Sequence, residues 1–421
     1  MRICVVTSYP PNIGGESTYA HSYVNALQKY LREEVSEIHV LSHKEGNGSD
    51  TVNRPESSKV IIYRLFKSTD PIRKNFSFLK IFNAILRIRP DVVHFEYSPL
   101  PKGKYGGIIG EPLLILFILL RIVRIPFFVT LHSIWLPDQA KQRLLELTKS
   151  HLLAKLGWYY YKTITCFFGR LPKSLFLLVT KGNSELIEQF SNTYNIPRSQ
   201  LKEELHGMWW HESQFEKFDK RPQRVVCLGV ITPSKGYEYT LEAMRIVVQK
   251  LPNSSLIIAG TTIAKEGKEY ISKLRQLTSA YSLDSTVSIE ERYLSDEEFN
   301  EYVRTAGVVV LPYTRVVGAS GIMTLAISYR VPIIIARSGA LFTEISDIVP
   351  NVPTLDHESL ADEIVKALGS KNNYDDLLRR YENYFSEHDW SVVVRTIYAE
   401  FVKAIGVTQA DIRLKALDRS T

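Results

Sequence analysis

Cysteine is scarce in this sequence. Its 421 residues include only three, Cys4, Cys166 and Cys227, and these lie far apart. Cys4 and Cys227 fall within apolar segments that we predict to be buried strands, so we interpret the cysteines as reduced thiols. Such usage is typical of a cytoplasmic protein rather than of a secreted one held together by disulfides.

An uninterrupted apolar run of transmembrane length is also missing. Residues 113–129 (LLILFILLRIVRIPFFV) come close, but Arg121, Arg124 and Pro126 interrupt them. They predict a buried helix followed by a strand at 127–131. A peripheral membrane face is the alternative there and at 152–176, where aromatic and basic residues mix. The apolar start, residues 1–8, is short and predicts a first strand rather than a secretory signal.

Charge of one sign is not concentrated in a dense stripe. The formal net charge is +7 and the pI is about 9.0, which allows contact with anionic lipid or a charged substrate but does not indicate a nucleic-acid partner. The ten histidines show no metal-ligand spacing, so we expect neither a metal nor a bound cofactor. PPNIGG follows the first predicted strand in place of a three-glycine fingerprint, which disfavours a dinucleotide oxidoreductase.

Alternating strands and helices fill most of the chain. Apolar residues make up 45%, and the length predicts two domains. Strands are expected at 3–7, 38–42, 60–65, 92–96, 127–131 and 175–180, with helices between them. This order predicts an α/β fold with parallel sheets covered on both faces. After a polar linker at 209–224 the same rhythm restarts. We predict domains at 1–210 and 222–388 and a helical tail at 389–421.

A turn of small residues lies in the second predicted domain. The segment 318–332 (GASGIMTLAISYRVP) follows an apolar strand at 308–312 and opens a helix at 322–329. The backbone amides of Gly318 to Gly321 can approach a ligand closely, and the helix directs its positive end at the same place. The pattern predicts an anion site.

A lysine upstream strengthens that prediction. An apolar strand at 225–228 ends at Gly229, and a short loop with Lys235 and Gly236 then begins a helix at 237–249. A lysine beside a glycine at the start of a helix suits a diphosphate, although a solvated lysine at a helix cap has the same pattern. Two such turns in one half of the chain favour the diphosphate interpretation.

The order of several short motifs resembles a known family. The motifs are PP and GG at Tyr9 to Gly15, DVVH at Asp91 to His94, VTLH at Val129 to His132, the G…KG loop at Gly229 to Gly236, IIAG at Ile257 to Gly260, LP at Leu311–Pro312, VPII at Val331 to Ile334, and SG at Ser338–Gly339 with Glu344 beyond. In this order they are similar to the GT-B retaining glycosyltransferases of family 4, also described as glycosyl transferases group 1.

The resemblance implies two Rossmann-like parallel-sheet domains that face a central cleft. It implies metal-independent hexosyl transfer from a nucleotide-diphosphate sugar to a glycan, lipid-linked or small-molecule acceptor, as in cytoplasmic polysaccharide biosynthesis. Donor sugar and base stay open. Lys235 and His132 are the implied catalytic residues. The implied donor-binding residues are Gly14, Gly15, Gly229, Ser320, Gly321, Thr324 and Glu344.

Three positions depart from the family pattern, one of them Val230, where the family often has an arginine after the glycine of the lysine loop. Val317 and Leu325 stand where the family commonly has glutamates that face the donor sugar and the ribose. Neither aliphatic side chain can replace them, so a non-catalytic GT-B protein that acts as a partner or scaffold is the alternative function. Thr324 offers its hydroxyl either to the ribose or to the helix backbone. His132 and Glu344 also have structural alternatives, as a satisfied buried histidine and as a residue at a helix start.

Overall fold

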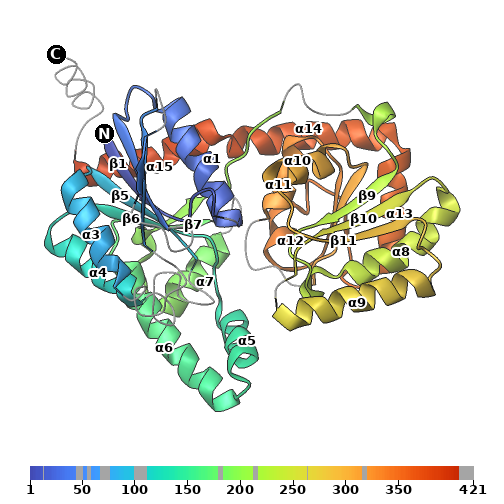
Figure 1. Ribbon diagram of the computed structural model, residues 1–421, viewed down its shortest axis with the longest axis horizontal. Coiled ribbons are helices and arrows are strands. Elements are labelled where there is room, and N and C mark those ends of the chain that lie inside the picture. The colour runs from blue at the N-terminus through green and yellow to red at the C-terminus, as the bar shows by residue number, and fades with distance from the viewer. Residues whose placement is uncertain are drawn as a thin grey trace. The chain divides into compact units, whose positions relative to one another are not determined.

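The computed structural model describes residues 1–12, 14–43, 51–54, 58–66, 76–98, 111–178, 184–211, 217–262, 264–314 and 320–406. The chain folds into two compact units (Figure 1). The first unit comprises Met1–Gly207 and the segment that begins at Trp390, and the second comprises Met208–Asp389. The predicted tail residues 407–421 and the predicted strand residues 179 and 180 lie outside the described residues.

The first unit is built on an eight-stranded sheet in the order β3-β4-β2-β1-β5-β6-β7-β8. The strands are β1 (Arg2–Val6), β2 (Glu37–His43), β3 (Thr51–Asn53), β4 (Val60–Phe66), β5 (Val92–Tyr97), β6 (Phe127–Leu131), β7 (Leu175–Leu178) and β8 (Leu201–Glu204). All neighbours are parallel except β3, which runs antiparallel to β4. The sequence did not predict β3 or β8.

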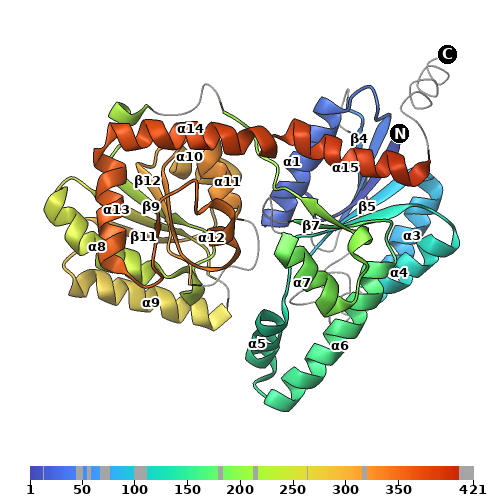
Figure 2. The ribbon, with the colours of Figure 1, turned by 180° about the vertical axis from the view of Figure 1, so that it is seen from behind.

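Helices cover both faces of this sheet (Figures 1 and 2). One layer contains α3 (Ser77–Ile88), α4 (Glu111–Ile122), α6 (His151–Arg170) and α7 (Ser184–Tyr194), and the other contains α1 (Gly15–Tyr30) and α15 (Trp390–Ile405). The helix α5 (Pro137–Thr148) packs along α6. Successive side chains of β6 point to opposite faces of the sheet. Phe127 packs on Phe117 of α4, and Phe128 packs on Phe401 of α15, so each face of the sheet has its own core.

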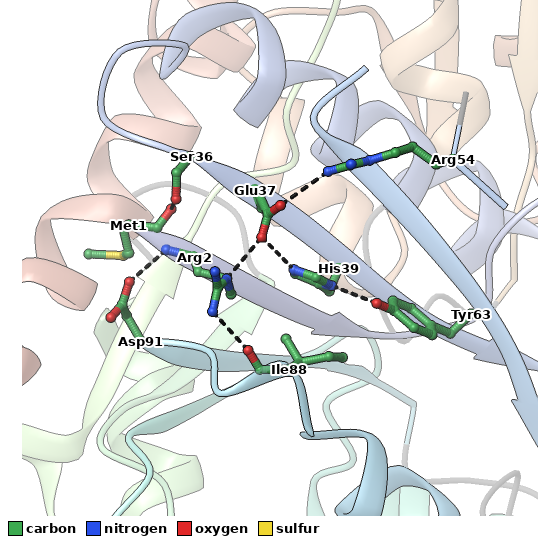
Figure 3. A network of polar contacts seen from close by, with 9 residues as sticks. All are labelled: Met1, Arg2, Ser36, Glu37, His39, Arg54, Tyr63, Ile88 and Asp91. Carbon is green, nitrogen blue, oxygen red and sulfur yellow. Dashed lines mark hydrogen bonds and ion pairs between the residues drawn. The ribbon is translucent and has the colours of Figure 1, made fainter. Parts of the chain in front are cut away.

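Ion pairs and hydrogen bonds tie the amino ends of the strands together (Figure 3). The Arg2 amide donates to Asp91 Oδ2 (2.6 Å), and the Arg2 Nε donates to Glu37 Oε2 (2.9 Å). His39 bridges that carboxylate and the Tyr63 hydroxyl. Burial opposes ionisation of Glu37, but the hydrogen bonds from His39 and Arg2 outweigh it, so the Glu37 pKa is lowered. These contacts hold β1, β2 and β4 in register near their amino ends. They leave the carboxyl edge of the sheet available for ligand binding.

The second unit contains a fully parallel six-stranded sheet in the order β11-β10-β9-β12-β13-β14. The strands are β9 (Arg224–Leu228), β10 (Ser255–Gly260), β11 (Val287–Glu291), β12 (Val308–Leu311), β13 (Ile333–Ala336) and β14 (Asn351–Val352). Short runs of Val, Ile and Leu fill its central strands, as expected for strands buried on both faces. This sheet agrees with the predicted α/β class.

Two helical layers again enclose the sheet. The helices α8 (Tyr237–Lys250), α9 (Ala264–Ala280) and α13 (His357–Gly369) bury one core, and α10 (Asp296–Arg304), α11 (Gly321–Ser328), α12 (Gly339–Ile345) and α14 (Lys371–His388) bury the other. Single 3₁₀ turns are η1 (Arg198–Gln200), η2 (Phe218–Lys220) and η3 (Pro233–Lys235). Within the predicted linker, Trp210 packs on Phe385 and His211 stacks on Tyr329, so these two residues belong to the second unit.

Each sheet has one point where the strand order reverses. In the first sheet the chain proceeds from β1 to one side and returns to place β5 on the other side of β1. In the second sheet the same reversal separates β9 from β12. Open parallel sheets bind ligands outside the carboxyl ends of the strands at such points. The fold therefore directs attention to the loops after β1, β5, β9 and β12.

Candidate active site

The loop after β9 carries the lysine that the sequence singles out. Gly229 follows β9 with φ 113°, and a Cβ added there would lie 3.2 Å from Ile322 Cδ1 at the start of α11. Gly236 follows Lys235 with φ 65°, and a Cβ there would lie 2.3 Å from the Pro312 carbonyl oxygen. Only glycine tolerates this conformation and this approach. Gly236 therefore lets the lysine loop pack against the end of β12, and Gly229 lets it approach the start of α11.

The Lys235 side chain is half-buried and lies over an aromatic ring. Its Nζ lies 3.6 Å from the centroid of Tyr313, the second residue after β12. Burial lowers the Lys235 pKa to about 8, and no carboxylate of the described chain opposes the shift. The ring face attracts the ammonium group, but a ring is a weaker partner than a carboxylate. The site therefore holds a cation whose charge an anionic ligand would stabilise.

The start of α11 adjoins the same tyrosine. The Ser320 hydroxyl accepts a hydrogen bond from the Met323 amide (3.4 Å) and caps the helix. Burial raises the Tyr313 pKa, and the Ser320 hydroxyl acts in the opposite direction, which places Ser320 beside Tyr313. A Cβ added to the exposed Gly321 would meet no atom within 4 Å. The backbone at Gly321 therefore leaves room for the close approach of a ligand. Gly318, Ala319 and Val317 lie outside the described residues.

Two further predicted donor residues have partners of their own. The Thr324 hydroxyl donates to the Gly321 carbonyl oxygen (2.9 Å) within α11 and is buried, the helix-backbone alternative raised by the sequence. Glu344, on α12, accepts a hydrogen bond from the Tyr384 hydroxyl at Oε1 (2.7 Å). Its Oε2 is buried without a hydrogen bond from any described residue, and burial raises the Glu344 pKa to about 7. Leu325 is half-buried against the core that contains α11.

In the first unit, the predicted histidine lies at the carboxyl edge of the sheet. His132 directly follows β6, and its Nε2 lies 2.6 Å from Glu96 Oε2 on β5. Burial opposes protonation of His132, but the hydrogen bond and charge of Glu96 outweigh it, so the His132 pKa is raised. Tyr19 of α1 packs edge-on against the imidazole, with the ring centroids 4.8 Å apart. The pair therefore places an imidazole whose protonation Glu96 favours at the edge where ligands bind.

The glycine pair at the start of α1 is open. Gly14 caps the helix with φ 132°, and its carbonyl oxygen accepts a hydrogen bond from the Ser17 amide (2.9 Å). A Cβ added at Gly14 or Gly15 would meet no atom within 4 Å. The loop after β1 therefore leaves room for close approach of a ligand to the backbone.

A chain of hydrogen bonds, absent from the sequence prediction, runs beneath this edge. The Tyr19 hydroxyl donates to Glu204 Oε1 (2.6 Å), and the Thr130 hydroxyl donates to Glu204 Oε2 (2.6 Å). His94 Nε2 lies 2.8 Å from Thr130 Oγ1, and His94 Nδ1 lies 2.9 Å from the Tyr23 hydroxyl. All five side chains are buried. We call this set the Glu204 chain.

Burial decides the protonation of the Glu204 chain. It lowers the His94 pKa, so that imidazole is neutral near pH 7. Burial and then the charge of Glu96 raise the Glu204 pKa to about 8, against the hydrogen bonds from Thr130 and Tyr19. Glu204 is therefore a neutral carboxylic acid at neutral pH. The chain is a fixed polar support beneath His132, and it contains no formal charge.

The structure thus brings the predicted residues into two groups. Lys235 and Ser320 lie beside Tyr313 in the second unit, and Gly229 lies close to Ile322 at the start of α11. In the first unit, His132 meets Glu96. Within the described residues, no group of three or more His, Cys, Asp or Glu side chains is arranged to hold a metal ion. Sequence reasoning missed Tyr313 and Glu204. Tyr313 follows the LP motif and could have been noticed, but nothing in the polar LKEE of β8 marks Glu204.

The two sheets, their strand orders and their carboxyl-edge loops define a GT-B fold. Residues 210–384 match the family model described as glycosyl transferases group 1. Together these findings support a glycosyltransferase of GT-B fold. No curated protein matches the chain.

Solved structures with the same architecture cover almost the whole chain. HepE from Anabaena in complex with UDP is 13% identical, with a TM-score of 0.64, over 96% of this chain and 100% of that one. Sucrose-phosphate synthase from Thermosynechococcus elongatus is 15% identical, with a TM-score of 0.66, over 96% and 99%. A UDP-forming α,α-trehalose-phosphate synthase from Burkholderia xenovorans is 11% identical, with a TM-score of 0.66, over 95% and 99%. At these identities the similarity establishes the fold.

Proposed function

We propose that this protein is a retaining, metal-independent glycosyltransferase of family 4. It moves a hexosyl group from a nucleotide-diphosphate sugar to a glycan, lipid-linked or small-molecule acceptor in cytoplasmic polysaccharide synthesis, and it needs no cofactor. UDP-sugars are the donors to test first, since UDP is bound in the HepE structure. The observation that carries the proposal is Lys235, a half-buried amine over the Tyr313 ring, in a loop that lies next to the start of α11.

In the proposed reaction, the bond between the anomeric carbon and the diphosphate oxygen breaks, and its electron pair stays on that oxygen. A new bond forms from the acceptor oxygen to the anomeric carbon, and the acceptor hydroxyl passes its proton to an oxygen of the leaving diphosphate. Negative charge therefore grows on the leaving diphosphate. Lys235 and the first amides of α11, at Gly321 and beyond, stabilise this charge, as preorganised donors do in other transfer reactions.

The remaining residues have positioning roles in this proposal. Gly229 and Ser320 let the backbone approach the diphosphate, and Thr324 secures the first turn of α11. Glu344, whose Oε2 has no hydrogen bond from a described residue, binds a hydroxyl of the donor. His132 contacts the transferred sugar, with Glu96 holding its imidazole. Gly14 and Gly15 leave space for donor or acceptor beside α1.

A non-catalytic GT-B protein is the second candidate function. Leu325 favours it, because a half-buried aliphatic side chain against the core cannot hydrogen-bond a ribose. The two functions differ in whether the purified chain consumes a nucleotide sugar.

A two-stage experiment tests the proposal. Thermal shifts across UDP-, GDP-, ADP- and dTDP-sugars identify the donor, because a ligand that binds only the folded state raises the melting temperature. Release of the matching nucleoside diphosphate is then measured with and without candidate acceptors, and NMR of the product reports the anomeric configuration. A stabilising donor that is never consumed would support the non-catalytic function. An inverted product would remove the retaining assignment.

A further inference from the structure

The helix α6 is apolar on two faces. Its inner face buries Ala154, Trp158 and Tyr161 against the core of the first unit. Its outer face exposes six large apolar side chains, each 41–67% accessible: Leu152, Leu153, Leu156, Tyr159, Tyr160 and Phe167. A helix of a soluble domain normally places polar residues on its outer face. Figures 1 and 2 show α6 and its partner α5 extending from the rest of the first unit.

The exposed residues form a stripe rather than a scatter. Leu152, Leu156 and Tyr159 are spaced four and three positions apart, and Phe167 continues the same line two turns further on. Residues at these spacings lie above one another on one side of a helix. The stripe therefore runs nearly the full length of α6.

Two neighbouring helices extend this apolar surface. The helices α3, α4 and α6 lie side by side in one layer (Figures 1 and 2). Of the 17 large apolar side chains that are exposed in the described chain, 11 lie on these three helices. Soluble monomers rarely expose a contiguous apolar patch of more than a few hundred Å², and larger patches mark interaction sites. We call the outer surface of α3, α4 and α6 the apolar–basic face.

The charge on this face has one sign. Its exposed basic residues are Lys80, Arg87, Arg121, Lys155, Lys162 and Arg170. The only acidic residue in the three helices is Glu111, at the first position of α4. The whole chain has a formal net charge of +7, so much of that excess is gathered here.

We propose that the apolar–basic face docks the protein onto an anionic lipid bilayer. Leucine and aromatic side chains enter the boundary between headgroups and acyl chains, while lysine and arginine side chains reach the lipid phosphates. A second copy of the chain fits this face less well, because a symmetric dimer would bring the same basic residues together. Within the described chain no helix is long and apolar enough to cross a membrane, and this attachment is peripheral. The inference does not depend on the proposed transferase reaction.

Vesicle co-sedimentation of the full chain tests the inference. Binding is expected to vesicles of phosphatidylcholine mixed with phosphatidylglycerol, to weaken as salt rises, and to be lost with phosphatidylcholine alone. A Lys155→Gln/Lys162→Gln variant is expected to lower the partition coefficient by roughly fivefold per lysine. A Leu152→Ser/Leu156→Ser variant is expected to bind weakly even at low salt. Since all four side chains are exposed, circular dichroism should show unchanged folding.

The matched control removes equal charge elsewhere. Lys268 and Arg275 are exposed on α9 in the second unit, and the Lys268→Gln/Arg275→Gln variant is expected to bind as the parent does. Absence of binding by the parent at low salt would overturn the inference. An equal loss of vesicle binding in the control variant would also overturn the inference, because binding would then depend on the net charge of the chain and not on this face. So would a dimer in sedimentation analysis that dissociates in the Leu152→Ser/Leu156→Ser variant while vesicle binding is absent.

Discussion

Replacing Glu204 by glutamine should make the stability of the first unit less sensitive to a rise in pH between pH 5 and pH 7. The Thr130 hydroxyl donates to Glu204 Oε2 when this carboxyl group is ionised. When Glu204 is protonated its O–H donates to Thr130 instead, so Thr130 can donate to His94 Nε2, and His94 Nδ1–H can donate to the Tyr23 hydroxyl. Glutamine reproduces this order, since its amide donates to Thr130 while its oxygen accepts from Tyr19. The variant therefore preserves the hydrogen-bond chain and removes only the ionisable proton.

The size of the effect follows from proton linkage. Because the folded-state pKa of Glu204 is raised to about 8, the folded chain keeps a proton that the unfolded chain loses above its ordinary pKa of about 4.3. The contribution of Glu204 to the free energy of unfolding is complete below the ordinary pKa of about 4.3. It is lost as pH rises from there through the folded-state pKa of about 8. The loss is about 1.4 kcal/mol per pH unit, or about 2–3 kcal/mol between pH 5 and pH 7.

Hydrogen exchange can follow the first unit separately from the second. The free energy of opening is measured for the amides of β5 and β6 in parent and Glu204→Gln protein at pH 5, 6 and 7. The variant is expected to gain about 2–3 kcal/mol relative to the parent across that range. Glu37→Gln is the matched control in the same unit. Because the Glu37 pKa is lowered, the stability that this residue gives is lost only as pH falls below its ordinary pKa of about 4.3. The difference between Glu37→Gln and the parent should therefore stay nearly constant between pH 5 and pH 7. If the difference in opening free energy between Glu204→Gln and the parent did not change with pH, the conclusion that Glu204 is a neutral carboxylic acid in the folded chain would be refuted.

Three further predictions concern the chemistry and the packing. Lys235→Ala should lower kcat/KM by about 30- to 1000-fold, equivalent to about 2–4 kcal/mol of transition-state stabilisation, and wild-type turnover in a folded variant would remove Lys235 from the site. Gly207→Ala should lower the free energy of unfolding by about 1–3 kcal/mol in thermal unfolding experiments, because its Cβ would lie 2.4 Å from ring atoms of the buried Trp390; an unchanged melting temperature would contradict this packing. Transfer activity should survive excess chelator in a product-release assay, whereas full loss restored by Mg²⁺ or Mn²⁺ would contradict a metal-independent reaction.

The sequence predicted most of the fold because its central strands are short apolar runs between helices. The prediction of β6 at residues 127–131 is confirmed, and no bound of β1, β2, β4 or β5 differs from the predicted one by more than one residue. The edge strands were harder. The strand β8 (LKEE) has two partly buried positions and is mostly charged, and β3 is fully exposed, so neither has the apolar pattern that identifies a buried strand.

The candidate site was predictable where backbone geometry leaves a sequence signature. The glycines at 229 and 236 indicate a positive φ and a close approach of the loop to neighbouring residues. Lys235 could be predicted because it lies in the same loop. Long-range pairing leaves no such signature. Tyr19 and Glu204 are 185 positions apart in the chain and meet only because α1 covers the sheet that contains β8. The protonation of Glu204 depends on that burial, so no local pattern could have indicated it.

Calorimetric titration of a nucleoside diphosphate tests the central claim, that the start of α11 holds the donor diphosphate, most directly. UDP is titrated first, into the parent, Gly321→Val and Gly369→Val. Neither glycine has an atom within 4 Å of an added Cβ, so both variants should fold, but only Gly321 lies at the start of α11. The account predicts that Gly321→Val abolishes diphosphate binding, that Gly369→Val leaves it intact, and that the nucleoside alone binds poorly to all three proteins. Diphosphate binding by Gly321→Val as tight as that of the parent would contradict the account.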